Sequence, residues 1–140
     1  MCGIAGIHRR GNKQIPQVNT LADYLLLGIE DRGQDATGFM AMLASGKVQV
    51  EKAVVPASKF VLGRKAISAA ARSVLLHTRW ATVGNARDPR NAHPVISGKC
   101  AAVHNGTIYN HREVFTAFRL PRKAEVDSEV IPAKIGRAHV

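Results

Sequence analysis

Aromatic residues are scarce in this chain of 140 residues, where Phe, Trp and Tyr together make up 5%. Hydrophobic residues nevertheless account for 46%, so Ala, Val, Leu and Ile must fill the core of what we expect to be one globular domain. No apolar run is long enough to cross a membrane as a helix. The opening residues also lack the pattern of a secretory signal peptide, because Arg9 and Arg10 follow a very short apolar stretch.

Cysteine and acidic residues are few as well. Cys2 and Cys100 are the two cysteines; they do not make a disulfide scaffold, and they favour a reducing, cytoplasmic location. The six histidines show no spacing typical of a zinc site, so we expect no metal. Ten acidic residues against twenty basic ones give a net charge of +10, yet no basic run reaches five residues. We therefore expect a solvated basic surface and no nucleic-acid partner.

Short apolar segments separated by turns predict a mixture of strands and helices. The predicted strands cover residues 2–7, 38–44, 47–55, 74–76 and 99–103, with a hairpin turn at Ser45 and Gly46. One predicted helix begins at a Thr20 cap, and its apolar face is expected to contain Leu21, Tyr24, Leu25 and residues 27–29. A second helix is predicted over residues 58–71, and a third from a capping box of Asn110 and Glu113 to about Leu120. Cys100 is expected to be a buried strand residue without a chemical role. Hairpins combined with helical connections favour an α+β fold of stacked layers.

Cys2 directly follows the initiator methionine, and this position has a chemical consequence. If Met1 is removed, one residue carries both a thiol and a free α-amino group. The amino group titrates near neutrality, with a pKa of roughly 7.7–8.0, so it can act as the base for its own thiol. An N-terminal nucleophile is built in this way, although a small residue opening a strand is the structural alternative.

Two polar segments contain groups that suit a binding site. The turn over residues 31–38 has two glycines, and Arg79 follows the predicted strand 74–76 and stands beside Trp80, the only tryptophan. The planar guanidinium fork of arginine suits a carboxylate. The structural alternatives are a plain helix-to-strand connection for the turn and a surface arginine stacked on an aromatic ring for the second segment.

Two later segments add a donor pair and an acid. Asn105 next to Gly106 offers a side-chain amide and a backbone N–H at one point, as an oxyanion hole requires. Asp127 can hold an ammonium group. A plain Asn-Gly turn and a helix N-cap are the structural alternatives. His77 and His104 flank the motifs and are expected to be structural rather than acid–base groups.

The order and identity of these motifs together carry more information than any one of them. The chain contains Cys-Gly-Ile-x-Gly-Ile, Arg-Gly-x-Asp-x-x-Gly, His-Thr-Arg-Trp-Ala-Thr, His-Asn-Gly and Asp-Ser-Glu-Val-Ile. From Cys2 to Ile131 it resembles the class II glutamine amidotransferases, which are N-terminal-nucleophile hydrolases. The resemblance implies a four-layer αββα sandwich, here truncated at the C-terminal side, with residues 1–134 as a partial glutaminase domain.

The resemblance also implies a division of roles around glutamine as the substrate. Cys2 would attack the side-chain amide, and Asn105 with the Gly106 N–H would stabilise the oxyanion. Glutamine would be bound by Arg79, Trp80, Thr82 and Asp127, while Arg32 and Gly33 would support the nucleophile. His93 would either line the glutamine pocket or anchor its loop. Arg79 would hold the α-carboxylate and Asp127 the α-ammonium group. The products would be glutamate and ammonia, formed through a thioester without a cofactor.

The acceptor of the ammonia is less sharply indicated. Residues 91–94 and the Trp80 motif are similar to glucosamine-6-phosphate synthases, which transfer ammonia to fructose 6-phosphate in amino-sugar biosynthesis. Residues 32–35 are more similar to amidophosphoribosyltransferases, and Val83 departs from the synthase pattern. A stand-alone glutaminase-like protein, an inactive fragment and a glutamine-binding module remain alternatives. The resemblance implies an acceptor domain or subunit that this chain does not contain, and a full-length protein that is a homo-oligomer.

The last six residues have an unusual origin in our interpretation. Residues 135–140 match the translation of ATC GGA AGA GCA CAC GTC, a string of a common sequencing adapter, and Lys134 can be encoded in the frame that the adapter needs. We therefore predict that the native sequence leaves this chain near residue 134 and that the remainder is a non-native read-through tail.

Overall fold

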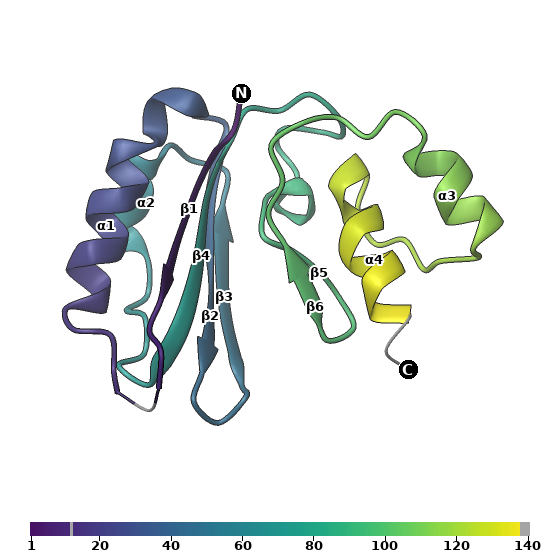
Figure 1. Ribbon diagram of the computed structural model, residues 1–140. Coiled ribbons are helices and arrows are strands. Elements are labelled where there is room, and N and C mark those ends of the chain that lie inside the picture. Colours follow the sequence, from purple (N-terminus) through teal and green to yellow (C-terminus); the bar gives the residue numbers. More distant parts are fainter. Residues whose placement is uncertain (12, 138–140) are drawn as a thin grey trace.

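A four-stranded antiparallel sheet forms the centre of the protein in a computed structural model, which describes residues 1–11 and 13–137. The strands follow the order β1-β4-β2-β3 across the sheet. Their bounds are β1 (Gly3–His8), β2 (Ala36–Leu43), β3 (Val48–Ala53) and β4 (Ala71–Arg79). Helices α1 (Val18–Gly28) and α2 (Ala57–Gly63) cover one face of this sheet (Figure 1). The predicted β2–β3 hairpin, with its turn at Ser45 and Gly46, is confirmed.

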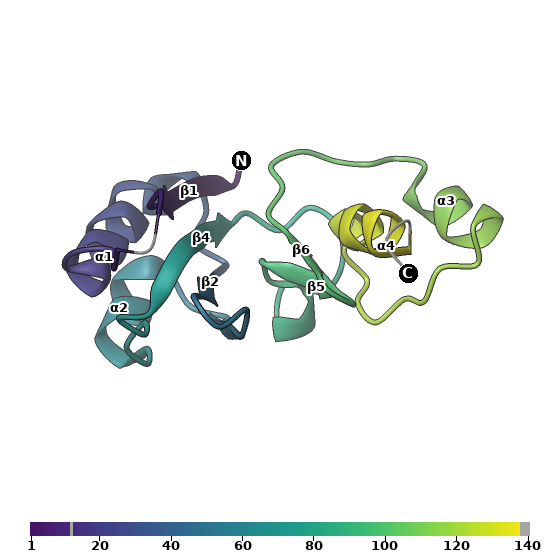
Figure 2. The ribbon, with the colours of Figure 1, turned by 60° about the horizontal axis from the view of Figure 1, so that its bottom comes forward.

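A smaller unit lies on the other side of the large sheet. It contains the antiparallel strands β5 (Val95–Ser97) and β6 (Cys100–Ala102) and the helices α3 (His111–Ala117) and α4 (Val130–Arg137). The 3-10 turns are η1 (Glu30–Arg32), η2 (Pro89–Asn91) and η3 (Asp127–Glu129). Figures 1 and 2 show the same succession of helices, large sheet, small sheet and helices. The predicted α+β fold class is therefore confirmed, and both described sheets are antiparallel.

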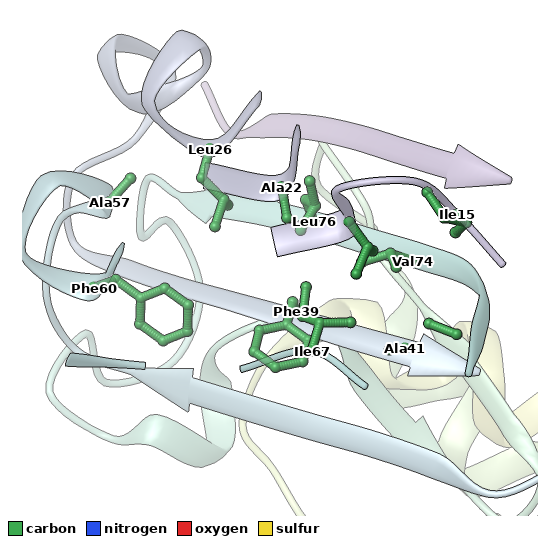
Figure 3. Packing of buried hydrophobic residues seen from close by; sticks show 12 residues of the cluster. Ile15, Ala22, Leu26, Phe39, Ala41, Ala57, Phe60, Ile67, Val74 and Leu76 are labelled. Carbon is green, nitrogen blue, oxygen red and sulfur yellow. The ribbon is translucent and has the colours of Figure 1, made fainter. Parts of the chain in front are cut away.

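The main core lies between the large sheet and the helices α1 and α2 (Figure 3). Val18, Ala22 and Leu26 are four residues apart, so they share one face of α1, and all three are buried. They pack with Phe39 of β2, whose ring meets Phe60 of α2 edge to face at 6.3 Å between centroids. Each buried Leu or Phe side chain stabilises the fold by about 1.5–3 kcal/mol, so this aliphatic core compensates for the scarcity of aromatic residues.

The opposite face of the large sheet is covered at one end only. The strand register places Gly38 and His77 opposite each other on this face. There the 91–93 segment packs closely, because a Cβ at Gly38 would overlap the carbonyl oxygen of His93. Farther along the same face, exposed apolar side chains lie on three of the strands. They are Ile4, Met42, Val48 and Val50.

The predicted start of α1 and its apolar face are wrong. The helix begins at Val18, after Gln17 in a left-handed conformation, so Thr20 lies inside the first turn and is not the cap. Leu21 and Tyr24, which were expected to face the core, are exposed. The helix instead turns its smaller residues toward the sheet, as the burial of Ala22 shows.

The predicted helix over residues 58–71 is also wrong in length, since α2 ends at Gly63. Side chains from elsewhere in the fold bind the backbone N–H groups of the next residues. Lys65 N–H donates to Glu51, Ile67 N–H to Asn19, and Ser68 N–H to Gln49, at 2.8, 2.8 and 3.0 Å. Because these acceptors replace the helical carbonyls, the segment is satisfied as a loop.

Three smaller differences concern the second unit. Asn110 precedes α3, but its side chain makes no capping hydrogen bond, and the helix ends at Ala117 rather than near Leu120. Strand β5 was not predicted, because its three residues are too few to show a pattern. Cys100 does lie on a strand, β6, but it is half-buried rather than buried.

The C-terminal residues 135–137 belong to α4, while residues 138–140 of the predicted read-through tail lie outside the described residues. The origin of the tail stays a prediction. Among the helices that the structure describes, none combines the length and apolar character needed to cross a membrane.

Candidate active site

The pairing of β1 with β4 brings Cys2 to the end of β4. Gly3 at the start of β1 lies opposite Thr78 of β4, so Cys2 comes next to the point where β4 ends in Arg79. A Cβ at Gly3 would lie 2.5 Å from Thr78 Oγ1 and 2.7 Å from the carbonyl oxygen of Ile29. Glycine after the cysteine therefore allows this close approach between segments.

The Cys2 thiol lies against the backbone of Trp80. The Trp80 N–H donates to Cys2 Sγ at 3.3 Å, and Sγ lies 3.5 Å from the Trp80 carbonyl oxygen. Met1 precedes Cys2 in the described chain, so the Cys2 nitrogen is a peptide N–H. It donates to Oδ1 of Asn105 at 3.1 Å. Removal of Met1 would convert this nitrogen into an amine at the same place.

An open cavity of about 300 Å³ lies beside the thiol. Its size is at the lower end of the range of small-molecule sites. The lining residues are Met1, Cys2, Trp80, Thr82, Asn105, Gly106 and Thr107. A Cβ at Gly106 would lie 2.9 Å from Nε2 of His104, so glycine is required by the close approach of that ring. The structure thus brings the predicted nucleophile and both predicted oxyanion donors to one cavity.

Arg79 and Asp127 line a much narrower cavity of about 10 Å³ that also touches Cys2, Thr82 and His93. Arg79 is 2% exposed, and its guanidinium donates to the carbonyl oxygen of Val83 at 2.8 Å, with those of Gly84 and Asn85 at 3.5 Å. Burial lowers the pKa of Arg79, while nearby acidic groups and Cys2 oppose the shift. A space of this size holds about one water molecule.

Asp127 is equally buried, at 2% exposure. One carboxylate oxygen accepts the N–H of Ile108 at 2.5 Å, and the other lies 3.4 Å from the Ser128 hydroxyl. The bond to Ile108 fixes the carboxylate next to the chain that carries Asn105 and Gly106. An acid and a guanidinium therefore line the same narrow cavity beside the thiol.

The turn after α1 contacts the backbone of Cys2 and of the end of β4. Arg32 Nε donates to the Cys2 carbonyl oxygen at 3.2 Å. A Cβ at Gly33 would overlap the backbone of Arg79, so this glycine permits close contact between the turn and the end of β4. Asp35, to which the sequence analysis gave no role, accepts the Ala81 N–H at 2.7 Å and thereby holds the segment that follows Trp80.

Two buried histidines, His77 and His93, lie together with the half-buried His104 close to the narrow cavity. The rings of His77 and His93 stack at 4.2 Å between centroids, and Nε2 of His77 lies 3.1 Å from the His104 carbonyl oxygen. Burial lowers the pKa of His77 to about 4. Burial and the neighbouring His77 and Arg79 lower the pKa of His93 to about 2. Both rings are therefore neutral at pH 7, and neither can serve there as an imidazolium acid.

His93 has a further property. Its ring is 3% exposed, and neither ring nitrogen has a hydrogen-bond partner among the residues that the structure describes. The residue lines the narrow cavity, and its role in binding glutamine stays a prediction. Within the described part of the chain, no group of three or more His, Cys, Asp or Glu side chains is arranged to hold a metal ion.

Comparison with known proteins gives an independent view of the chain. No family model matches it. It is 36% identical over 137 residues to a glutamine–fructose-6-phosphate aminotransferase (isomerizing) of Sulfolobus acidocaldarius, 38% over 138 residues to that of Sulfurisphaera tokodaii, and 40% over 147 residues to that of Symbiobacterium thermophilum. The matches cover 94%, 94% and 99% of this chain.

The coverage of the relatives themselves is much smaller. The chain spans 22%, 23% and 22% of the length of these three proteins, about a fifth of each. The matching part is their N-terminal region. The chain is therefore homologous to the N-terminal region of the glutamine–fructose-6-phosphate aminotransferases.

Proposed function

We propose that the chain hydrolyses the side-chain amide of glutamine through Cys2, giving glutamate and ammonia. The observation that carries this proposal is the position of Cys2, whose nitrogen contacts Asn105 and whose sulfur contacts the Trp80 backbone at the edge of a 300 Å³ cavity. Removal of Met1 is the first requirement, because it frees the α-amino group that takes the thiol proton.

The reaction then follows from the groups around Cys2. The sulfur attacks the amide carbon of glutamine, and the developing oxyanion receives hydrogen bonds from Asn105 and from the N–H of Gly106. Because Oδ1 of Asn105 accepts from the Cys2 nitrogen, its NH2 group is free to donate to the oxyanion. The tetrahedral intermediate expels ammonia, which takes up the proton that the amine received. Water then cleaves the thioester to glutamate and regenerates the thiol.

Recognition of free glutamine is assigned to Arg79 for the α-carboxylate and Asp127 for the α-ammonium group. Trp80, Thr82 and His93 shape the pocket between these groups and the thiol. The cavity of about 10 Å³ is too small for the α-amino-acid end of glutamine. We therefore expect this cavity to widen when glutamine binds.

The relatives' name contains fructose 6-phosphate, which we propose as the acceptor of the ammonia, with glucosamine 6-phosphate as the product. We propose this transfer, the acceptor domain that it needs and a homo-oligomeric assembly for the whole protein, of which this chain is a fragment. We also propose that α1 with α2, the large sheet, the small sheet and α3 with α4 belong to the four layers of an αββα sandwich.

A glutamine-analogue electrophile tests the hydrolytic function. The Met1-free chain is treated with the analogue, and intact-mass and peptide spectrometry identify the labelled residue, while glutamate release is measured in parallel. We expect one adduct, on Cys2, and loss of both label and hydrolysis in Cys2→Ala. The matched control is Cys100→Ala, which removes the other, half-buried thiol. An unlabelled chain that still binds glutamine in calorimetry would favour a binding module instead.

A further inference from the structure

A junction of three segments lies beside the narrow cavity and has no role in the proposal above. The Val83–Asn85 loop contributes backbone groups, η2 contributes Asn91, and the segment before η3 contributes Glu125. Asn91 is completely buried, whereas Glu125 lies at the surface. These residues are 34 positions apart in the sequence, so their contact is a product of the fold.

The side-chain amide of Asn91 and one carboxylate oxygen of Glu125 make several hydrogen bonds within this junction. One carboxylate oxygen of Glu125 accepts the Asn85 N–H at 2.8 Å and the Asn91 NH2 at 3.2 Å. The Asn91 NH2 also donates to the Asn85 carbonyl oxygen at 3.1 Å. Asn91 Oδ1 accepts the N–H groups of Glu125 and Val126 at 2.8 and 3.2 Å. The loop is thus fastened to the 125–126 segment through both side chains.

The packing at this junction is tight. Gly84 has a φ of +80°, a conformation that favours glycine, and an added Cβ would lie 2.9 Å from Nδ2 of Asn91 and 3.1 Å from Cβ of Glu125. The hydrogen bonds from Asn85 and Asn91 also lower the pKa of Glu125, so its carboxylate is charged at neutral pH. A charged acceptor makes stronger hydrogen bonds than a neutral one.

The junction lies between Arg79 and Asp127, the two residues assigned to the recognition of glutamine. On one side, the loop carbonyl groups of Val83 and Gly84 accept from the guanidinium of Arg79. On the other side, Val126 immediately precedes Asp127. The position of the loop and the position of the Asp127 carboxylate are therefore set by the same pair of side chains.

We infer that Glu125 and Asn91 are positioning residues for glutamine, which fix the Val83–Asn85 loop relative to Asp127 and so determine the affinity for the α-amino-acid end. The inference rests on the proposed hydrolysis of glutamine. It assigns these residues to substrate binding and not to the chemical step, because neither residue lines a cavity with Cys2.

Steady-state glutaminase kinetics of the Met1-free chain test the inference. In Glu125→Ala we expect the KM for glutamine to rise about tenfold, with kcat within about twofold, because hydrogen bonds to a charged acceptor are lost away from the reacting atoms. Glu125→Gln keeps an oxygen that can accept the Asn85 N–H and is expected to restore most of the KM. Glu125→Asp shortens the side chain, so the carboxylate no longer reaches the Asn85 N–H, and this variant is expected to resemble Glu125→Ala. If Glu125→Ala does not fold, Glu125→Asp replaces it in the test.

The control is Asp88→Asn, which weakens the ion pair with Arg90 in the segment that follows the loop. Its KM is expected to stay within about twofold. Hydrogen exchange at the Asn85 amide shows whether the loop has been released in each variant. An unchanged KM with faster exchange in Glu125→Ala would overturn the inference alone, as would equal impairment of the Gln and Ala variants. An unaltered chain that neither hydrolyses nor binds glutamine would overturn the proposed function, and the inference with it.

Discussion

Asn105 is the residue at which two requirements of the proposed chemistry meet. Its carboxamide oxygen accepts from the Cys2 nitrogen at 3.1 Å, and the residue lines the cavity beside the thiol. The oxygen can thus orient the nucleophile's base while the NH2 group faces the developing charge. An aspartate at this position could still accept from the Cys2 nitrogen but could not donate to the oxyanion. Substitution can therefore separate the two functions.

We expect Asn105→Asp and Asn105→Ala to lower kcat for glutamine hydrolysis by a similar factor, about 10²–10³, because both lack the oxyanion donor. Single-turnover and steady-state glutaminase assays measure the effect. Asn110→Ala is the matched control, since the Asn110 side chain makes no capping hydrogen bond. Near-normal activity of the aspartate variant would show that the carboxamide NH2 does not stabilise the transition state.

The motifs point to several of the residues that line the two cavities. Cys2, Arg79 and Asp127 lie far apart in the sequence, and all three line the narrow cavity; their roles with glutamine stay predictions. Asp35 and Glu125 were missed as supporting residues. Acidic residues in loops are common, and only the folded chain shows that the first accepts the Ala81 N–H and the second that of Asn85.

Among the elements, the connection between α1 and β2 has the closest relation to the site. Arg32 contacts the Cys2 carbonyl oxygen, and Gly33 lies directly under the backbone at the end of β4. No side chain fits between the two segments. The turn therefore sets the distance between the first residue of the proposed site and the strand that carries Arg79.

Gly33→Ala is expected to lower the free energy of unfolding by about 1–3 kcal/mol, because the new methyl group must displace backbone rather than a flexible side chain. It is also expected to slow alkylation of Cys2. Urea unfolding and the rate of thiol labelling measure the two effects. Gly28→Ala, where a Cβ meets nothing within 4 Å, should leave stability unchanged or slightly higher. Equal effects of the two substitutions would contradict the proposed packing.

Local patterns predicted some elements well and others poorly. The β2–β3 hairpin followed from Ser45 and Gly46, because its register depends on a short turn and alternating residues. The length of α2 did not, since the residues after Gly63 bond to side chains of α1 and β3 that no local pattern reveals. The face of α1 was mistaken because Ala22 is small and its complete burial depends on the opposing sheet.

For the whole molecule, the buried histidines connect the two halves of the fold. His77 belongs to β4 of the large sheet, and His93 to the segment before β5. Their stacked rings lie where the 91–93 segment meets the large sheet. Imidazole rings are ordinarily protonated in weak acid. Folding places these two rings in a buried environment, where a positive charge is poorly solvated.

The free energy of unfolding is expected to decrease as the pH falls from about 7 to 4. The folded-state pKa values of His77 and His93, about 4 and about 2, lie below the ordinary value of 6.5, so the unfolded chain binds more protons in this window. Each ring contributes up to about 1.4 kcal/mol per pH unit. Urea unfolding at several pH values measures the slope, which His93→Gln should reduce and the exposed control His8→Gln should not. Equal slopes in all three proteins would contradict this account.

The position of β1 at the edge of the large sheet has a consequence for how activity is lost. Its only strand neighbour within the described sheet is β4, and Cys2 lies just before its first residue. Strand ends at sheet edges open locally at a lower free energy than the core. Fraying of the first few residues would carry the sulfur away from Trp80 and Asn105 while α1 and the central strands stay folded. Heat inactivation should therefore precede the loss of secondary structure, and the reactivity of one thiol would report the opening of a single strand.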